Sequence, residues 1–341
     1  MTTEGGRSIA VIGAGSWGTA LAGLLADKGY DISLWAHHAD HAAAINRDRE
    51  NKKYLPGFAL HDRIMAASEL GEVVAGRDVI LMVVPSHVYR EVFSRVLPWL
   101  GKDAIVVSAT KGIEDESLMT MSQVMADELK GVGREAAIGV LTGPSFAREV
   151  AARIPTAVTV AAMEKEIAVT IQKIFSTERF RVYTSTDLIG QELGAALKNI
   201  IAIAAGICDG LGYGTNTRAA LITRGLAEIS RLGVKMGASP LTFAGLGGLG
   251  DLVLTCTGDL SRNRTVGIRL GQGKKLAEIL AEMAMVAEGV KTTRSAWKLA
   301  HREKVEMPIL DQIYQVLYED KPCREAVTAL LARDLRQEME F

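Results

Sequence analysis

A few polar residues stand in otherwise apolar segments, and their types suit charge stabilisation and proton transfer. Lys198 and Asn199 interrupt the apolar run 193–207. A lysine and an amide in so apolar a helix either reach outward to solvent or face a polar cleft. Asp251 and Thr255 are four residues apart, which puts both on one face of a helix. The sequence therefore offers a lysine, an amide and a carboxylate for a catalytic site.

A second group of residues could hold an anion. Ser261, Arg262, Asn263 and Arg264 are consecutive, and guanidinium groups with hydroxyl and amide neighbours suit bidentate binding of phosphate. Lys111 follows an apolar strand, at the end where open parallel sheets bind ligands. Each cation could equally be a solvated surface charge. The net charge is -1, so no overall field attracts nucleic acid or an anionic membrane, and local charges must hold an anionic ligand.

The clearest motif is Gly13-Ala14-Gly15-Ser16-Trp17-Gly18, which follows an apolar run and precedes helical residues. In this strand–turn–helix context, G-x-G-x-x-G is the dinucleotide-binding fingerprint. The first Gly permits the turn, the second lets a pyrophosphate approach the backbone, and the third lets helix pack on strand. The N–H groups at the helix N-terminus bind the pyrophosphate. The motif predicts NAD or NADP as cofactor.

The end of the second predicted strand bears on the choice between the two cofactors. An NAD site usually has an acidic residue there, bound to the ribose 2′-hydroxyl, whereas this chain has His37 and His38. Because a 2′-phosphate would be repelled by a carboxylate and attracted by imidazoles, we expect NADP at least as readily as NAD. His37, His38 and His41 could instead be metal ligands. Because they occupy positions i, i+1 and i+4, His38 would lie on a different helical face from the other two, so we expect no metal site.

The hydrophobic pattern predicts the elements that position these residues. At about 150 residues per domain, 341 residues suggest two domains. Apolar, mostly β-branched runs alternate with helical segments in the first half, which indicates an α/β fold with a doubly wound, mostly parallel sheet. The predicted strands are 8–12, 31–35, 79–84, 104–108, 137–141 and 157–161. Long helical runs follow from about residue 186, so we expect a Rossmann-type domain at 1–187 and an all-α substrate-binding domain at 188–341.

Glycine is in excess: the chain has 34, against about 24 at the usual frequency of ~7%. Fourteen lie between residues 190 and 258, and we expect these segments to approach a ligand closely.

The three cysteines form no C-x-x-C pattern, which argues against disulfides or a cysteine zinc site and favours a reducing, cytoplasmic location. A glycine cluster breaks the uncharged stretch 8–26, so we expect neither a membrane span nor a signal peptide.

In order along nearly the whole chain, several motifs resemble the NAD(P)-dependent glycerol-3-phosphate dehydrogenases of bacterial type. The motifs are 13–18, 110–112, 143–147, 198–216, 247–251 and 261–263. The run 198–216 is the most restrictive of them. The resemblance implies reversible, NAD(P)H-dependent reduction of dihydroxyacetone phosphate to sn-glycerol 3-phosphate, which would supply glycerophospholipid synthesis.

The resemblance, together with the fingerprint, also implies roles for individual residues. Lys198 would be the acid–base group, with Lys111 and Asp251 beside it. The implied cofactor contacts are Gly13, Gly15, Ser16, Trp17, Gly18, His37, His38, Lys111, Ala147, Arg262, Val286 and Glu288. The implied substrate contacts are Lys111, Gly143, Ser145, Lys198, Asn199, Asp251, Thr255, Ser261, Arg262 and Asn263. His37 departs from the family, in which many members carry arginine at this position.

The implied chemistry sets a condition on the pKa of Lys198. As the ketone is reduced, an ammonium group can stabilise the charge that develops on its oxygen and then protonate it. In the oxidation direction the lysine must be neutral, although a free lysine has a pKa of about 10.4. We therefore expect burial and the charge of Lys111 to lower the pKa of Lys198, and we assign Asp251, which would oppose this shift, to orientation.

Two alternative functions stay open. One is a related 3-hydroxyacid or 6-phosphogluconate-type dehydrogenase, which also joins a dinucleotide domain to a helical one and uses a lysine. The other is an NAD(P)-binding sensor without catalytic activity. Apart from a small phosphorylated substrate, we expect no nucleic-acid or membrane partner. The sequence leaves open whether the chain forms a homodimer.

Overall fold

The computed structural model describes residues 7–283, 287–335 and 337–338. The chain forms two compact units, which we call the sheet unit (residues up to 110, with 121–188) and the helical unit (111–120, with 189–341). The domain boundary after residue 187 stays a prediction. One difference from it is plain, because residues 111–120 pack with the helices and not with the sheet. The reason is apolar contact: Ile113 and Leu118 belong to the hydrophobic core of the helical unit.

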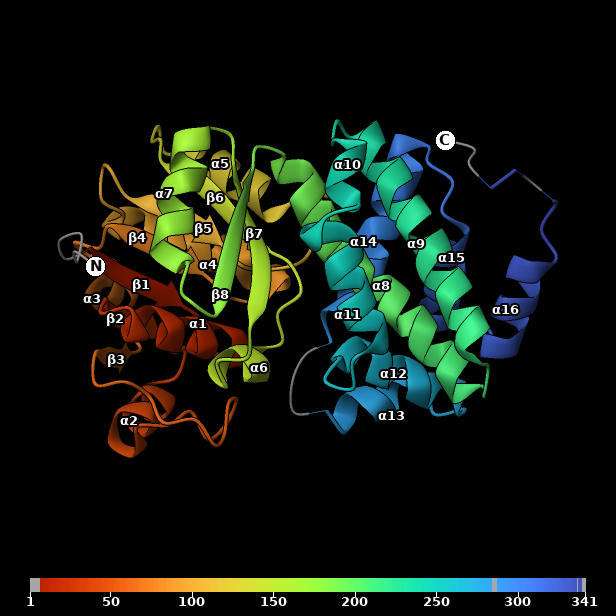
Figure 1. Cartoon of the computed structure of the whole chain (residues 1–341), viewed down its shortest axis with the longest axis horizontal. Coiled ribbons are helices and arrows are strands. Elements are labelled where there is room, and N and C mark those ends of the chain that lie inside the picture. Colours follow the sequence, from red (N-terminus) through yellow and green to blue (C-terminus); the bar gives the residue numbers. More distant parts are fainter. Residues whose placement is uncertain (1–6, 284–286, 336, 339–341) are drawn as a thin grey trace. The chain divides into compact units, whose positions relative to one another are not determined.

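The sheet unit is an eight-stranded sheet in the order β3-β2-β1-β4-β5-β6-β7-β8 (Figure 1). Every neighbouring pair is parallel except β6 and β7, which confirms the mostly parallel sheet. The strands are β1 (Ser8–Ile12), β2 (Asp31–Trp35), β3 (Ile64–Ala67), β4 (Val79–Met82), β5 (Ile105–Ser108), β6 (Ala137–Thr142), β7 (Thr156–Ala162) and β8 (Phe180–Ser185). The carboxyl ends of β1 to β6 therefore meet at one edge of the sheet, where a dinucleotide is expected to bind.

Two strands, β3 and β8, were not predicted from the sequence, and these are the two edges of the sheet. An edge strand has one side open to solvent, so it lacks the continuous apolar run of a central strand. In β8, Phe180 and Val182 are buried while Arg181 and Tyr183 are exposed. That alternation was the available signal for a half-buried strand.

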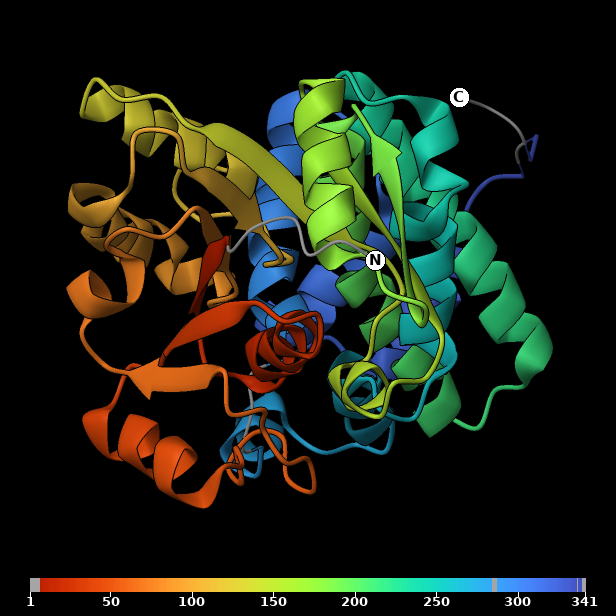
Figure 2. The same cartoon turned by 60° about the vertical axis from the view of Figure 1, so that its left-hand side comes forward.

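Helices cover both faces of this sheet (Figures 1 and 2). Helix α1 packs with α6 and α7, whereas α4 packs with α3 and α5. The helices are α1 (Ser16–Asp27), α2 (Ala39–Asp48), α3 (Leu70–Val74), α4 (Tyr89–Val96), α5 (Met121–Gly131), α6 (Ala147–Ala151) and α7 (Lys165–Phe175). Two layers of helices on a mostly parallel sheet confirm the doubly wound α/β fold.

The helical unit is built around α8 (Leu188–Gly210), which is buried from Gly190 to Cys208. The other helices are α9 (Thr215–Lys235), α10 (Pro240–Phe243), α11 (Asp251–Thr257), α12 (Arg262–Gly271), α13 (Leu276–Ala281), α14 (Glu288–Glu303), α15 (Pro308–Tyr318) and α16 (Cys323–Leu331). By length and composition α8 could cross a membrane, but 89% of its most apolar window is buried in the protein. A helix that is apolar on all sides is expected in such a core position.

Glycines let neighbouring helices of this unit touch backbone to backbone. A Cβ atom on Gly206 of α8 would lie 2.1 Å from the carbonyl oxygen of Arg264, and one on Gly267 of α12 would lie 2.0 Å from that of Ile203. Gly194 meets the carbonyl oxygen of Gly247 in the same way, at 2.5 Å. We expected the glycines of 190–258 to let the backbone approach a ligand, but Gly194 and Gly206 instead let the backbone approach other protein segments.

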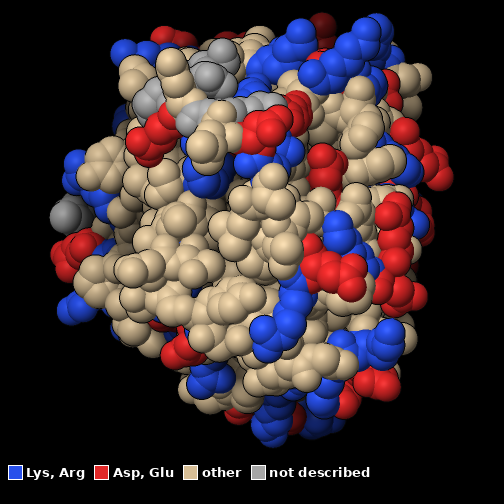
Figure 3. All heavy atoms as spheres, turned by 90° about the vertical axis from the view of Figure 1, so that its right-hand side faces the viewer, with Lys and Arg blue, Asp and Glu red and all other residues tan. Residues whose placement is uncertain are grey.

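Charges of both signs are interspersed on the face of the helical unit that lies to the right in Figure 1. Figure 3 shows Lys and Arg side chains next to Asp and Glu around a centre of uncharged residues. This face presents no extended field of one sign. Any anionic ligand must be held by individual cations, as the balanced composition indicates.

Candidate active site

Asp251, the first residue of α11, lies between two lysines in the helical unit. Its Oδ1 is 2.5 Å from Lys198 Nζ, and its Oδ2 is 2.7 Å from Lys111 Nζ. Asp251 is 1% exposed and Lys198 is 5% exposed. The two oxygens of one buried carboxylate thus hold two ammonium groups in place. The structure brings together the three residues that the sequence assigns to catalysis.

Thr255 completes the contacts of the Lys198 ammonium group. The amine donates to Thr255 Oγ1 at 2.7 Å, and this hydroxyl donates to the backbone oxygen of Asp251 at 2.6 Å. The predicted spacing of Asp251 and Thr255 on one helical face is confirmed, because both lie on α11. An ammonium group has three donors. In the described part of the chain, two of those of Lys198 have partners.

The surroundings of Lys198 favour its neutral form more than water does. Burial lowers the pKa of Lys198 to about 8, and the charge of Lys111 acts in the same direction, while Asp251 opposes the shift. The directions agree with the expectation from the sequence. Near neutral pH, both the charged and the neutral form of this lysine are therefore accessible.

A chain of amides connects α8, α12 and α14 beside this cluster. Asn263 Nδ2 donates to Asn199 Oδ1 at 3.0 Å, and Asn263 Oδ1 accepts from the backbone N–H of Gly289 at 2.9 Å. Gly289 fits tightly, since a Cβ atom there would lie 2.8 Å from both the Asn199 carbonyl oxygen and Asn263 Oδ1. This contact fixes the first turn of α14, which begins at Glu288. No local pattern in the sequence distinguishes Gly289.

The N-terminus of α12 presents Arg262 next to a capped first turn. Ser261 is the N-cap, and its Oγ accepts from the backbone N–H of Arg264 at 3.2 Å. The side chain of Arg262 is exposed to solvent. The protein around its guanidinium group removes part of the water and so lowers the pKa of Arg262, whereas the nearby charge of Glu288 raises it. Val286, another implied cofactor contact, lies outside the described residues.

Arg264, the other arginine of the cationic cluster, is held by two protein carboxylates. Its Nε lies 2.8 Å from Asp209 Oδ2 and its Nη1 lies 3.0 Å from Asp259 Oδ1. Arg218 also pairs with Asp209, at 3.1 Å. The ion pairs of Arg264 hold the first turn of α12 to the end of α8. Of the two arginines in the predicted cluster, only Arg262 stays a predicted phosphate contact.

In the sheet unit, the three glycines of the fingerprint have different surroundings. Gly13 has a φ of +123°, and a Cβ atom there would lie 2.6 Å from the Val83 oxygen. A Cβ atom on Gly18 would lie 1.9 Å from the Gly13 oxygen. Gly15 has ordinary dihedrals, with φ at −77°, and a Cβ atom there would meet nothing within 4 Å. Because no protein contact explains this glycine, the open space beside it fits the approach of a dinucleotide pyrophosphate.

Two further features of this turn bear on cofactor binding. Ser16 and Trp17 begin α1, and the buried indole Nε1 of Trp17 has no partner among the described residues. Asn51, which the sequence analysis did not single out, is 1% exposed and donates to the Ala14 oxygen at 2.9 Å and to Thr19 Oγ1 at 2.8 Å. His41 in turn contacts Asn51 Oδ1 at 3.0 Å. Asn51 therefore holds the glycine-rich turn in place.

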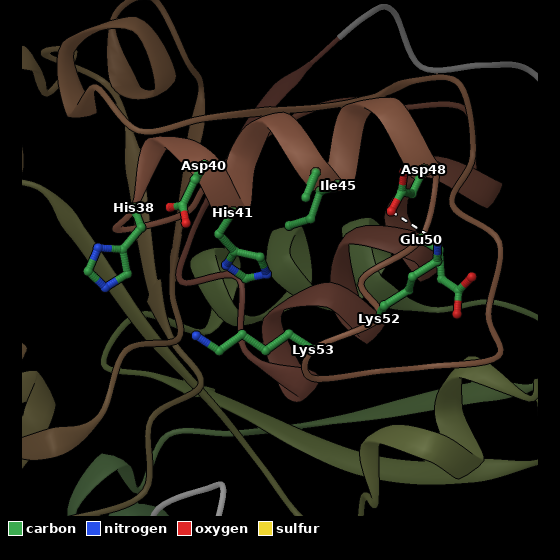
Figure 4. A pocket seen from close by; sticks show the side chains of 9 residues that line it. His38, Asp40, His41, Ile45, Asp48, Glu50, Lys52 and Lys53 are labelled. Atoms are coloured by element: carbon green, nitrogen blue, oxygen red, sulfur yellow. Dashed lines mark hydrogen bonds and ion pairs between the residues drawn. The ribbon is translucent and has the colours of Figure 1, made fainter.

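His37 and His38 follow β2 and are both exposed, with their rings 4.6 Å apart. His38 borders a hollow of about 260 Å³ that α2 and the following loop enclose (Figure 4). Lys53 extends along this hollow, and in the described part of the chain its ammonium group has no carboxylate partner, whereas Lys52 pairs with Asp48 at 3.0 Å. Among the described residues, no group of three His, Cys, Asp or Glu side chains could hold a metal ion.

Gly143, Ser145 and Ala147 follow β6 at the same sheet edge. Gly143 has a φ of +122°, and Ser145 Oγ donates to the Gly143 oxygen at 3.0 Å. Ala147 is the first residue of α6. Their contacts with substrate and cofactor stay predictions, as does the role of Glu288.

A Rossmann-type sheet unit joined to a helical unit with a buried lysine is typical of a dinucleotide-dependent dehydrogenase. Comparison with known proteins defines the family. The N-terminal model of NAD-dependent glycerol-3-phosphate dehydrogenase matches residues 8–168, and the C-terminal model matches residues 187–328. The chain belongs to the NAD-dependent glycerol-3-phosphate dehydrogenase family.

Individual relatives match over almost their whole length. The glycerol-3-phosphate dehydrogenase [NAD(P)+] of Syntrophobacter fumaroxidans is 56% identical over 98% of both chains. The protein of the same name from Citrifermentans bemidjiense is 57% identical, over 97% of this chain and 99% of its own. A crystal structure of glycerol-3-phosphate dehydrogenase from Coxiella burnetii is 40% identical and superposes with a TM-score of 0.92, over 96% of this chain and 99% of that one.

Replacing Gly15 and Gly18 by Ala should separate cofactor binding from folding. Gly15→Ala should leave the free energy of unfolding unchanged but weaken binding of NADPH and NADH about tenfold or more, because the new methyl group occupies the space for the pyrophosphate. Gly18→Ala should destabilise the fold, since its methyl group would overlap the Gly13 carbonyl. Denaturant unfolding and cofactor titration measure the two effects. Equal cofactor affinity in Gly15→Ala and the wild type would contradict the assignment.

His37→Asp should shift the cofactor preference towards NADH. A carboxylate at the end of β2 would repel a 2′-phosphate and accept a hydrogen bond from a 2′-hydroxyl. We expect the ratio of kcat/KM for NADPH to that for NADH to fall about tenfold or more, as loss of one charge-assisted contact would produce. An unchanged ratio would mean that other residues contact the 2′ position. Asp40→Asn, in the first turn of α2, is a control for a general change of charge.

Proposed function

We propose that this chain catalyses the reversible reduction of dihydroxyacetone phosphate to sn-glycerol 3-phosphate with NAD(P)H, and that Lys198 is its acid–base group. The observation that carries the assignment is the Lys198–Asp251–Lys111 cluster. Among the described residues, two protein oxygens accept hydrogen bonds from the Lys198 ammonium group, and we assign its third donor to a substrate oxygen. The surrounding helices keep this lysine dry and at an altered pKa, which is typical of a catalytic group.

In the reduction direction, Lys198 acts as an acid. The nicotinamide, when bound, supplies the hydride. As the carbonyl carbon is reduced, negative charge develops on its oxygen, and the ammonium group of Lys198 stabilises that charge and donates its proton. With a pKa of about 8, roughly nine-tenths of Lys198 is protonated at pH 7. The resting enzyme is therefore ready for reduction.

In the oxidation direction, Lys198 acts as a base. Its neutral amine accepts the proton of the substrate hydroxyl group. The neutral fraction rises with pH through the pKa of about 8, so the oxidation rate should rise over the same range. Asp251 does not take part in proton transfer, because it is held by two cations and serves to orient both amines.

The substrate phosphate is assigned to the N-terminus of α12. Arg262 supplies a guanidinium group, and the first backbone N–H groups of the helix favour an anion. Ser261 and Asn263 lie within the same turn and stay predicted contacts. We assign the cofactor to the glycine-rich turn of β1 and α1, where Gly15 leaves open space. NAD and NADP both fit this site, and we favour NADP slightly because His37 and His38 replace the acidic residue.

The setting of the reaction is also a proposal. The cysteines Cys208, Cys256 and Cys323 are all free, which fits the reducing environment of the cytoplasm. The product would be consumed by acyl transfer in glycerophospholipid synthesis. A homodimer stays a prediction.

The direct test is turnover of dihydroxyacetone phosphate by the wild type and by Lys198→Met. General acid–base groups contribute about 10² to 10⁴ in rate, so we expect Lys198→Met to lose at least a hundredfold in kcat while it binds NADPH within a fewfold of the wild type. Lys235→Met, at an exposed position of α9, is the matched control and should keep full activity.

Three outcomes would contradict the proposal. Turnover of a hydroxyacid without turnover of dihydroxyacetone phosphate would favour the related hydroxyacid dehydrogenases. Cofactor binding without turnover of either substrate would favour a sensor. Full activity of Lys198→Met would remove Lys198 from the chemistry.

A further inference from the structure

The segment 111–120, which we call the strap, leaves the sheet unit after Thr110 and returns to it at Met121, yet it packs with the helical unit. It closes on itself: Ile113 pairs with Thr120 in an antiparallel bridge, and the Glu114 N–H donates to the Met119 oxygen at 2.9 Å. Ile113 is 3% exposed within the helical core. The strap is therefore a folded part of the unit that contains Lys198.

Asp115 joins the strap to one side of α14. Its Oδ1 accepts from Lys298 Nζ at 3.0 Å and from Ser295 Oγ at 3.4 Å, and its Oδ2 lies 3.3 Å from Arg294 Nε. One turn further, Arg302 donates to the Ser117 oxygen at 3.4 Å. Successive turns of α14 thus bind the same strap, and most of these contacts are made by the carboxylate of Asp115.

The position of the strap matters because it begins with Lys111. Lys111 is four residues before Asp115, and its amine holds Asp251 Oδ2 at 2.7 Å. Helix α14, to which Asp115 binds, is itself fixed at its start by the contact of Gly289 with Asn263. The chain on the other side of Lys111 leads into the sheet unit. The contacts of the strap thus act together with the Lys111–Asp251 ion pair to hold Lys111 on the helical unit.

We propose that Asp115 is a positioning residue for the reaction: by holding the strap on α14 it keeps the ammonium group of Lys111 against Asp251. This inference rests on the proposed function, since it assumes that Lys198 is the acid–base group. Asp115 itself contacts neither Lys198 nor Asp251 in the described structure. It acts through Lys111.

The consequence for catalysis is electrostatic. The charged groups that face Lys198 are Asp251 from α11 and Lys111 from the strap, and the thiol of Cys256 on α11 is near enough to be influenced by its charge. Lys111 lowers the pKa of Lys198, whereas Asp251 raises it. If Lys111 moves away, Asp251 is left to Lys198 alone and the pKa of Lys198 rises. Less of the neutral base is then present at a given pH.

Asp115→Asn tests this role with little change of shape. In a plot of kcat for glycerol 3-phosphate oxidation against pH, kcat rises as Lys198 loses its proton. We expect the midpoint of this rising limb to move to a pH about 0.5 to 1 unit higher, and kcat at pH 7.5 to fall about three- to tenfold. The KM for the cofactor should stay within about twofold. Because Asp115 and its partners are partly exposed, high salt should bring the wild-type profile closer to that of the variant. Glu116→Gln, at an exposed position of the strap, should behave as the wild type.

The same substitution in a Lys111→Met background separates a positioning role from a purely structural one. If Asp115 acts through Lys111, Asp115→Asn should cause no further shift of the limb in that background. An equal shift with and without Lys111 would overturn the proposal, as would a limb in Asp115→Asn that coincides with that of the wild type. Should Asp115→Asn fold poorly, Lys298→Met removes a partner from the α14 side and should shift the limb in the same direction.

These outcomes are distinct from failure of the proposed function. Full activity of Lys198→Met would mean that the limb does not report Lys198, and the proposed function would fail. Loss of activity in Lys198→Met together with an unshifted limb in Asp115→Asn would reject only the role of Asp115.

Discussion

The interaction on which the site depends is the sharing of one buried carboxylate between two ammonium groups. Asp251 has Lys198 on one oxygen and Lys111 on the other. A buried lysine without a counter-charge would lose its proton. A buried lysine that paired with a carboxylate of its own would have a pKa too high to serve as a base. Two cations on one carboxylate give an intermediate result. Burial then sets the balance, and the pKa of Lys198 falls to about 8.

The packing of the helical unit serves this arrangement. Glycines in α8 and α12 let the two backbones touch, and so the side chains of Asn199 and Asn263 can meet. Gly194 lets the segment before α11 approach α8 in the same way, which delivers Asp251 to Lys198. A bulkier residue at such a contact would separate the helices by the width of a methyl group or more. The hydrogen bond between Asn263 and Asn199 would then be lost.

Most of the sheet and the candidate residues Lys198, Asp251 and Lys111 could be predicted from the sequence, because central strands are continuously apolar and a lysine within an apolar helix is unusual. The missed strands β3 and β8 lie at the edges, where one face meets solvent and the pattern is shorter. Other features depend on contacts between distant parts of the chain. The role of Asn51 in holding the glycine-rich turn, the clamp on Gly289 and the packing of residues 111–120 with the helices leave no local pattern in the sequence. The same holds for the ion pair of Arg264 with Asp209, because these two residues are 55 positions apart in the sequence.

Before any ligand binds, the fold lowers the pKa of Lys198 into the range that suits proton transfer. The most direct measurement is a pH titration of the ¹³Cε signal of Lys198 in protein with labelled lysine, assigned by its absence in Lys198→Met. We expect a midpoint near 8, because burial and the charge of Lys111 both lower the pKa. A midpoint near the ordinary lysine value of about 10.4 would contradict it.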